Sequence, residues 1–403
     1  MNKNDLIELS IEDMSDEGLG IGHAGGMAFF LKDTVVGDRV RARITALKKS
    51  YGFARAEEIL KPSAERVQAR CPAARRCGGC QLQEMSYEAQ LRLKENKVRS
   101  NLRRLGSFTL EGDRILGNTP PGAEPEESAA GAEDAAGTKK TVDEHEPSGT
   151  GTPGIFLPVI GMEEPWKYRN KAQFPIGYDR SGKLTAGFYA GRTHDIIDIR
   201  RCVIGIDENQ SILETVLGYM EKYHVTAYDE KSRKGIIRHV MTRAGFATGQ
   251  LMVVIVAAAD SLPKESMLVD ALLGLNCGIR SIVLNTNKAA TNVIMGDRVR
   301  ALYGEDFIED RIGDVIYRIS SRSFYQVNPV QTRKLYETVL EYAGLTGREA
   351  VWDLYCGIGT ISLFLAQKAR SVTGVEVVPD AIANARKNAE LNHIDNVRFI
   401  TGR

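Results

Sequence analysis

The sequence predicts a multidomain α/β protein with a small N-terminal β-barrel, a central α+β domain and a C-terminal Rossmann-like domain. Three observations predict it. Short strand-like runs separated by glycines fill residues 5–60, three cysteines follow in a C-x5-C-x2-C run, and strands alternate with helices after residue 322. At 403 residues the chain is long enough for two or three domains with cores of their own.

The N-terminal residues 5–60 are typical of a small β-barrel, because glycines supply turns between short strand-like segments. These segments are Leu6 to Ile11, Gly25 to Leu31, Arg39 to Leu47 and Tyr51 to Ile59. In the third segment basic and apolar residues alternate, which predicts Arg39, Arg41 and Arg43 on one face of a strand. That face is a candidate to follow RNA phosphates, and an ordinary solvent-exposed face is the alternative.

The charge is unevenly distributed along the chain. The net charge is only +1, yet residues 118–154 carry eight acidic residues against two lysines, so that segment is −6 and the remainder is +7. Residues 39–104 hold seventeen Lys and Arg against six Asp and Glu, a balance of +11. Such a concentration of basic residues favours a nucleic-acid partner, and a merely solvated surface is the alternative.

The acidic segment 118–154 has no aromatic residue and is predicted to be a disordered insertion whose removal affects function little. The longest apolar run, Leu251 to Ala259, predicts a buried strand, since a membrane-spanning helix needs roughly 20 apolar residues. The N-terminus has no apolar signal region. We therefore expect a cytoplasmic protein with no membrane partner.

The central domain is predicted to be a mixed α+β domain in two pieces around the insertion. A basic helix is expected from Tyr87 to Leu105, with leucines at roughly helical spacing. A hairpin is expected where Ile237 to Arg243 and Gln250 to Ala258 flank a glycine-containing turn, and Ser281 to Asn285 predicts another buried strand.

The four candidate metal ligands are Cys71, Cys77, Cys80 and Cys202. Gly78 and Gly79 let the backbone fold tightly around an inorganic core and turn N–H groups towards the sulfurs, which favours a [4Fe-4S] cluster. Zinc is the alternative, although structural zinc sites usually combine two short C-x2-4-C hooks, and four unrelated thiols are the third possibility. Disulfides are disfavoured because nothing in the sequence indicates export.

The chain after residue 322 predicts the beginning of a doubly wound α/β domain. Asn328 can cap a helix that has Pro329 at its first position. The alternating strands and helices that follow are Val351 to Tyr355, Thr360 to Ala369, Ser371 to Val377, Pro379 to Asn392 and Val397 to Ile400.

A Gly-x-Gly turn between the first strand and its helix predicts a nucleoside cofactor. Gly357 and Gly359 have no side chains to keep a ligand away from the backbone, and Glu376 ends the next strand, where a carboxylate can accept hydrogen bonds from both ribose hydroxyls. Ser362 stands where a nicotinamide-dinucleotide turn has its third glycine, which favours S-adenosylmethionine. A dinucleotide or a turn without ligand are the alternatives.

Several fragments together resemble the RNA 5-methyluridine methyltransferases, and most closely the 23S rRNA (uracil-5-)-methyltransferases. Besides the cysteine run they are YRNKAQ at 168–173, GFY at 187–189, HDIIDI at 194–199, SFYQVN at 323–328 and DLYCG at 353–357. The resemblance covers nearly the whole chain except the acidic insertion.

The resemblance implies three domains. They are a TRAM domain of OB-like fold over residues 1–61, a cluster-binding domain over 62–322, and the N-terminal part of an S-adenosylmethionine-dependent methyltransferase domain over 323–403. The family's cofactor contacts fall on Gln326, Tyr355 and Glu376, with Thr360 a further candidate. RNA is the implied partner, with 23S rRNA favoured over tRNA, and the complete protein is expected to be monomeric.

Methylation at uracil C5 needs two protein groups. A cysteine thiolate adds at C6, C5 of the enolate attacks the sulfonium methyl group, and a base then removes the C5 proton. The family carries these groups around Ser-Cys-Asn-Pro and Asp-Pro-Pro-Arg stretches, which do not occur before Arg403. We therefore expect a truncated chain that has no catalytic residue of its own and is inactive alone. Cys356 lies inside the cofactor turn and Cys277 is expected to be structural, so neither is taken as the nucleophile.

The predicted function is S-adenosylmethionine-dependent methylation of uracil C5 in RNA. The competing function is a non-catalytic iron–sulfur RNA-binding protein, and a dehydrogenase is a more distant third. The cluster is expected to serve structure or RNA placement, because methyl transfer is a two-electron step that needs no redox centre.

Overall fold

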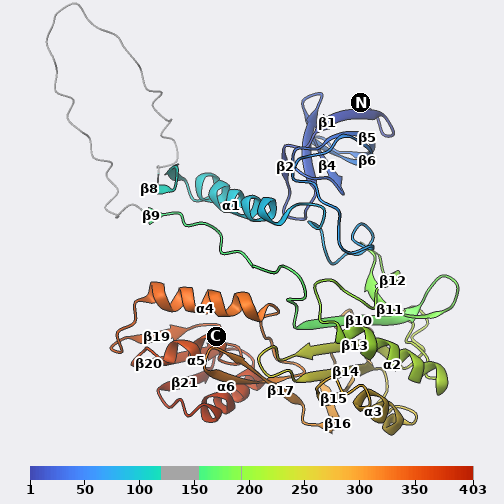
Figure 1. Cartoon of the computed structure of the whole chain (residues 1–403), viewed down its shortest axis with the longest axis vertical. Helices are drawn as coiled ribbons and strands as arrows, with labels where there is room; N and C mark the ends of the chain where they lie inside the picture. The colour runs from blue at the N-terminus through green and yellow to red at the C-terminus, as the bar shows by residue number, and fades with distance from the viewer. Residues whose placement is uncertain (119–153, 192, 403) are drawn as a thin grey trace, which may run out of the picture. The chain divides into compact units, whose positions relative to one another are not determined.

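The structure is a computed structural model that describes residues 1–118, 154–191 and 193–402 (Figure 1). The predicted acidic insertion therefore lies almost entirely outside the described residues. The chain forms two compact units, and these are Met1–Gln68 with Leu82–Gly161, and Ala69–Gln81 with Met162–Arg403. This division differs from the three predicted domains, whose boundaries stay predictions. No helix of the described part is long and apolar enough to cross a membrane.

The first unit contains a six-stranded sheet in the order β1-β5-β6-β4-β3-β2. Its strands are β1 (Leu6–Ser10), β2 (Asp13–Met14), β3 (Gly20–Ala24), β4 (Met27–Lys32), β5 (Arg39–Leu47) and β6 (Tyr51–Lys61). Alternation along β4 and β5 buries Phe29, Leu31, Val40 and Ile44 in one core and turns the residues between them outward. The four predicted strands are confirmed, and two short strands were not predicted.

The basic helix predicted after the sheet is confirmed as α1 (Tyr87–Arg104). The Ser86 side chain caps it by accepting a hydrogen bond from the Ala89 N–H. A small antiparallel sheet follows, built from β7 (Phe108–Glu111), β8 (Arg114–Asn118) and β9 (Gly154–Ile155).

The second unit contains a seven-stranded sheet in the order β12-β11-β10-β13-β14-β15-β16 (Figure 1). Its strands are β10 (Lys171–Tyr178), β11 (Leu184–Tyr189), β12 (Ile196–Asp198), β13 (Ile237–Ala244), β14 (Leu251–Ala257), β15 (Ile279–Thr286) and β16 (Arg298–Gly304). Helices α2 (Glu208–Lys222) and α3 (Glu265–Leu273) share its main core. The predicted β13–β14 hairpin and the buried strand at Leu251 are confirmed.

The C-terminal part of the second unit has a parallel sheet in the order β19-β20-β21. Its elements are α4 (Pro329–Ala343), β19 (Ala350–Asp353), α5 (Thr360–Ala366), β20 (Ser371–Glu376), α6 (Pro379–Leu391) and β21 (Val397–Thr401). Asn328 caps α4 as predicted, accepting the Gln331 N–H at 3.1 Å. The predicted order of strands and helices is thus confirmed.

A hairpin that precedes this sheet in the chain belongs to the same hydrophobic core. It consists of β17 (Phe307–Ile312) and β18 (Val315–Ser320). Tyr317 is fully buried beside Leu363 and Phe364, and its hydroxyl donates to the Thr360 carbonyl at 2.8 Å. These strands lie before the predicted domain boundary at residue 322, but they pack with the core of the C-terminal sheet.

Candidate cofactor site

The loop between β19 and α5 is held at both ends by one carboxylate. An Asp353 oxygen accepts the Ser362 hydroxyl at 2.5 Å, and the other oxygen accepts the Tyr355 N–H at 3.4 Å. Ser362, where a dinucleotide-binding turn has glycine, therefore braces the helix against the strand. The loop passes the carboxyl end of β20, because parallel neighbouring strands end at the same edge of a sheet.

The two glycines of the loop have different tasks. Both have positive φ, +54° at Gly357 and +81° at Gly359, which favours glycine. A Cβ at Gly359 would lie 2.8 Å from the Phe399 ring, so this glycine is required by packing. Nothing lies within 4 Å of a Cβ at Gly357, so the open backbone expected of a ligand-binding loop occurs at this position.

Glu376, at the end of β20, lies against the same loop. Its Oε2 accepts the Gly357 N–H at 3.2 Å, and its Oε1 accepts the Val378 N–H at 3.0 Å. A carboxylate has about four acceptor positions, so each oxygen can accept a further hydrogen bond. The structure thus brings together two of the six predicted cofactor residues, Gly357 and Glu376.

The other predicted cofactor residues lie in varied surroundings. Tyr355 is 90% exposed at the tip of the loop. The Thr360 hydroxyl lies 2.8 Å from the Tyr336 hydroxyl and so already has a partner within the protein. Gln326 lies just before α4, where its carbonyl accepts the Asn170 side-chain amide at 2.9 Å. Gln326 is therefore tied to the segment that leads into β10.

The two cysteines outside the predicted metal set are poor nucleophiles. Burial raises the pKa of the Cys356 thiol to about 12, with the Asp353 and Glu376 carboxylates adding to the rise. Burial also raises the pKa of Cys277. Because the thiolate is the reactive form, these shifts disfavour both thiols as nucleophiles, and the Cys356 thiol most.

The predicted metal ligands all belong to the second unit, and none of the six cysteines forms a disulfide. Cys77 Sγ accepts the Gly79 N–H at 3.4 Å. Burial raises the pKa of Cys202, and the neighbouring Cys80 and Cys71 thiols raise it further, while two backbone N–H groups lower it. Among the described residues, however, no three His, Cys, Asp or Glu side chains form a group that could hold a metal. The predicted [4Fe-4S] cluster is therefore not supported by this geometry.

The outward face of β5 carries arginines as predicted, but carboxylates already neutralise them. Arg41 forms ion pairs with Glu8 at 2.9 Å and Glu58 at 2.7 Å, and Arg43 pairs with Glu57 at 2.7 Å. The partners come from β1 and β6, the neighbours of β5 in the sheet. These pairs are exposed and weak, so the hypothesis that this face follows RNA phosphates stays a prediction.

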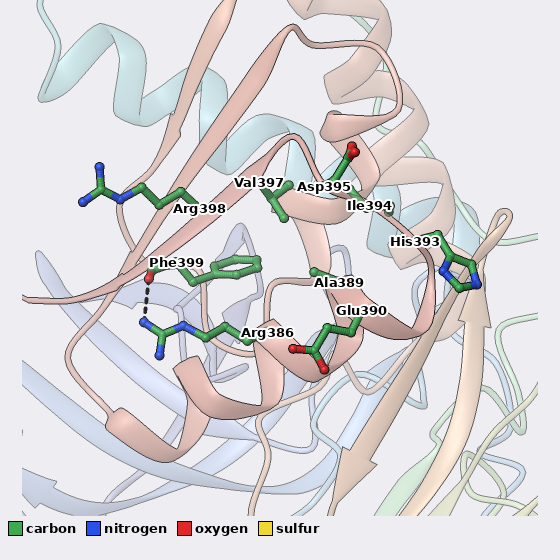
Figure 2. A pocket seen from close by; sticks show the side chains of 9 residues that line it. All are labelled: Arg386, Ala389, Glu390, His393, Ile394, Asp395, Val397, Arg398 and Phe399. Carbon is green, nitrogen blue, oxygen red and sulfur yellow. Dashed lines mark hydrogen bonds between the residues drawn. The ribbon is translucent and has the colours of Figure 1, made fainter.

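A surface pocket lies between α6 and β21 (Figure 2). Arg386, Glu390, His393 and Arg398 line it, and Arg386 donates to the Phe399 carbonyl at 2.9 Å. Its lining residues lie around the end of α6 and the start of β21, and they include none of the predicted cofactor residues. It is therefore a separate feature from the loop at the carboxyl end of β20.

Two family descriptions match the sequence. The TRAM domain matches residues 3–56, and the tRNA (Uracil-5-)-methyltransferase family matches residues 284–401. An RNA methyltransferase of Halalkalibacterium halodurans, named uncharacterized, is 42% identical over 402 residues, which are 100% of this chain and 78% of that protein. A similarly named protein of Clostridium acetobutylicum is 39% identical over 403 residues, again 100% of this chain and 78% of the relative.

The fold is similar to that of a solved enzyme, the Pyrococcus abyssi tRNA (uracil-54, C5)-methyltransferase in complex with S-adenosyl-L-homocysteine. The TM-score is 0.69 at 23% identity, covering 98% of this chain and 80% of that chain. The matches extend over the whole chain, so they do not bear out the prediction that it is truncated and lacks a catalytic segment. Two domain families match the sequence, and relatives about 40% identical match it over its full length. The chain therefore belongs to the RNA methyltransferases of the tRNA (uracil-5-)-methyltransferase family, with an N-terminal TRAM domain.

Proposed function

We propose that the protein methylates C5 of uracil in RNA, in the cytoplasm, with S-adenosylmethionine as the methyl donor. The observation that carries this proposal is the contact between the Gly357 N–H and the Glu376 carboxylate at the shared edge of β19 and β20. It combines an open backbone with a carboxylate that can accept hydrogen bonds from ribose hydroxyls. Family membership supports the reaction class, and the S-adenosyl-L-homocysteine complex of the Pyrococcus abyssi enzyme supports the donor.

Each proposed cofactor residue has a specific role in this site. Glu376 binds the ribose hydroxyls, and Gly357 lets the nucleoside lie against the backbone. The Tyr355 side chain is 90% exposed, so its ring is free to cover the adenine. Gly359 holds the turn. Gln326 and Thr360 are proposed contacts on the basis of the resemblance, and Thr360 would exchange its hydrogen bond to Tyr336 for one to the cofactor.

The proposed reaction proceeds through a covalent adduct. A thiolate forms a bond to C6 of uracil, and the displaced π electrons give an enolate whose C5 attacks the methyl group and releases S-adenosylhomocysteine. A base then removes the C5 proton, and the bond between sulfur and C6 breaks. We assign the nucleophile to neither Cys356 nor Cys277, since burial raises the pKa of both thiols and so disfavours the thiolate, and we assign no catalytic residue within residues 1–403.

The proposed substrate is 23S rRNA, with tRNA as the alternative. The test is to map 5-methyluridine in both RNAs from cells that lack the intact gene. Loss of 5-methyluridine from 23S rRNA supports the proposal, and loss from tRNA alone supports the alternative. If both RNAs keep all their 5-methyluridine, the proposed function is wrong.

We also propose that Cys71, Cys77, Cys80 and Cys202 hold a [4Fe-4S] cluster. The proposal rests on the C-x5-C-x2-C spacing of the sequence and on the Gly79 N–H that donates to Cys77 Sγ, a contact of the kind made to cluster sulfurs. It requires the four thiols to come closer together than they lie in this structure, where they form no metal-binding group among the described residues. A bound cluster would fasten the loop before α1 to the segment after β12 and would take no part in methyl transfer. Iron and sulfide content after anaerobic purification, with Cys202→Ser as the variant, tests the proposal. Colourless protein that contains zinc would contradict it.

A further inference from the structure

Three basic side chains meet where β10 lies beside β13. Lys171 and Arg243 are direct partners in the antiparallel register and so lie on the same face of the sheet. The Arg169 Nε donates to the Lys171 carbonyl at 2.9 Å. In the part of the chain that the structure describes, none of the three side chains forms an ion pair with a carboxylate.

Arg243 is buried with part of its hydrogen-bonding capacity unused. It is 1% exposed, and its Nη2 donates to the Ser323 carbonyl at 2.7 Å. Its Nε and Nη1 have no acceptor among the described residues. The acidic groups that face it are Asp306 and the Tyr325 phenol, and neither forms an ion pair with it. Because a buried cation with unmet donors is unfavourable, this arrangement calls for an anionic ligand.

The basic cluster is joined to the proposed cofactor site by the segment 323–328. Arg243 holds Ser323, and Asn170 holds the next part of the segment through hydrogen bonds to the Gln326 and Val327 carbonyls, both 2.9 Å. Lys171 is half-buried, so an anion can reach it from solvent, while Arg243 lies deeper beside it. An anion bound here would lie near the segment that carries Gln326.

We propose that Lys171 and Arg243 bind a backbone phosphate of the RNA substrate, close to the nucleotide that enters the active site. The inference rests on the proposed function, since it assumes that RNA reaches this site. A phosphate presents several acceptor oxygens at one point, which suits the fork of an arginine beside a lysine ammonium. The carboxylate of the methyl donor is the competing anion, and the experiment separates the two.

The test measures RNA affinity over a series of salt concentrations, with 23S rRNA and a tRNA transcript as separate probes. Lys171→Gln is expected to weaken binding about tenfold at low salt and to lower the slope of log K against log [salt] by about 1, because one phosphate contact is lost. Lys171→Arg should restore the slope. Lys183→Gln, the same change at the exposed β10–β11 turn, is the matched control and should leave the slope unchanged.

Two outcomes would overturn the proposal. One is an unchanged salt slope in Lys171→Gln. The other is a loss of S-adenosylmethionine affinity with RNA affinity intact, which would assign the anion to the methyl donor. RNA affinity is measured without methyl transfer, so the two proposals can fail separately. If Lys171→Gln lowers the salt slope but the protein makes no 5-methyluridine, the phosphate site is supported and the proposed function is wrong. Lys171 is half-buried, so we expect its variants to fold, and they test the proposal even if substitutions at the fully buried Arg243 prevent folding.

Discussion

Arg66 in the first unit and Arg243 in the second are both largely buried arginines, yet their partners differ completely. Arg66 Nη2 donates to Asp38 at 2.5 Å and to the Asp33 carbonyl at 3.2 Å, Nη1 donates to Glu84 at 2.7 Å, and Nε donates to Asp38 at 3.1 Å. Within the described ranges of the chain, the one acceptor for Arg243 is the Ser323 carbonyl. A guanidinium whose donors are all used by its own chain stabilises the fold, whereas one with unmet donors is available to a ligand.

The same comparison extends to the protein surface. The β5 arginines are exposed and paired with glutamates, so their charge is compensated within the sheet. The basic cluster at β10 and β13 has no such compensation in the part of the chain described by the structure. The number of arginines in a segment is therefore a poor guide to anion binding, and the partners of each guanidinium are a better one.

Removal of the Asp38 carboxylate should have the largest effect on stability. Burial raises the pKa of Asp38, but hydrogen bonds from Arg66 and two backbone N–H groups outweigh this and hold the pKa below its ordinary value. Asp38→Ala leaves Arg66 half paired and should lower the unfolding free energy of the first unit by about 3–5 kcal/mol. Chemical denaturation measures it, with Glu58→Ala as the exposed control. Equal losses in both variants would contradict the structural role of Arg66.

The same pair predicts how the first unit responds to acid. Because the folded pKa of Asp38 is lowered, its contribution to stability is present above the pKa of the unfolded chain and is lost as the pH falls through the folded value. In Asp38→Ala this part of the pH dependence should be absent.

Arg243→Met should have the opposite pattern to Asp38→Ala. Replacement of a partly unsatisfied buried cation by an apolar side chain of similar length should leave stability unchanged or raise it. RNA binding should weaken by about 2 kcal/mol, or roughly thirtyfold, because a buried charged contact is lost. Thermal unfolding and RNA titration on the same preparation measure both. A strong loss of stability would show that Arg243 is a structural residue like Arg66.

Glu376→Gln tests whether the cofactor site and the basic cluster bind different ligands, S-adenosylmethionine at Glu376 and RNA at Lys171 and Arg243. The amide keeps the shape of the side chain but loses the charge and one acceptor oxygen, so S-adenosylmethionine should bind less tightly by about 1.5–2 kcal/mol. RNA affinity should not change. Calorimetric titration gives the values, and Glu390→Gln at the separate pocket of Figure 2 is the matched control. Unchanged cofactor affinity would exclude Glu376 from the site.

The protonation of Lys171 gives a smaller and pH-dependent effect. Burial lowers its pKa to about 8, and the charges of Arg243 and Arg169 contribute. A bound phosphate favours the charged form, so RNA affinity should fall as the pH rises through 8, by up to about tenfold near pH 9. Lys171→Gln should remove this dependence. A pH profile that is identical in the variant and the parent would rule out Lys171 as the titrating group.

The sequence predicted local features well because their causes are local. Alternation in β5, the Asn328 cap of α4 and the meeting of Gly357 with Glu376 follow from strand periodicity, capping chemistry and parallel strand order. Cross-strand pairing was missed, because the register that sets Glu57 beside Arg43 is a property of the assembled sheet.

The importance of Arg243 and the packing of the β17–β18 hairpin were also missed. Alternation indicates which side of β13 an arginine lies on, but its burial depends on the segment around Ser323, which is 80 residues away in the sequence. The strands of the hairpin were not predicted, and the predicted boundary at residue 322 places them in the central domain, whereas Tyr317 packs with Phe364 from α5. Both features arise from contacts between distant segments, for which the local pattern holds no information.

Arg41→Gln should have the smallest effect, and this makes it the sharpest test of the whole comparison. Its guanidinium is exposed and its charge is compensated by Glu8 and Glu58, so the loss of these ion pairs should change stability by less than about 1 kcal/mol. RNA affinity should change by less than about twofold, and the salt slope should not fall, because no phosphate contact is lost. If Arg41→Gln lowered the slope as much as Lys171→Gln, RNA would displace the glutamates from β5, and partners within the chain would not decide which arginines bind the substrate.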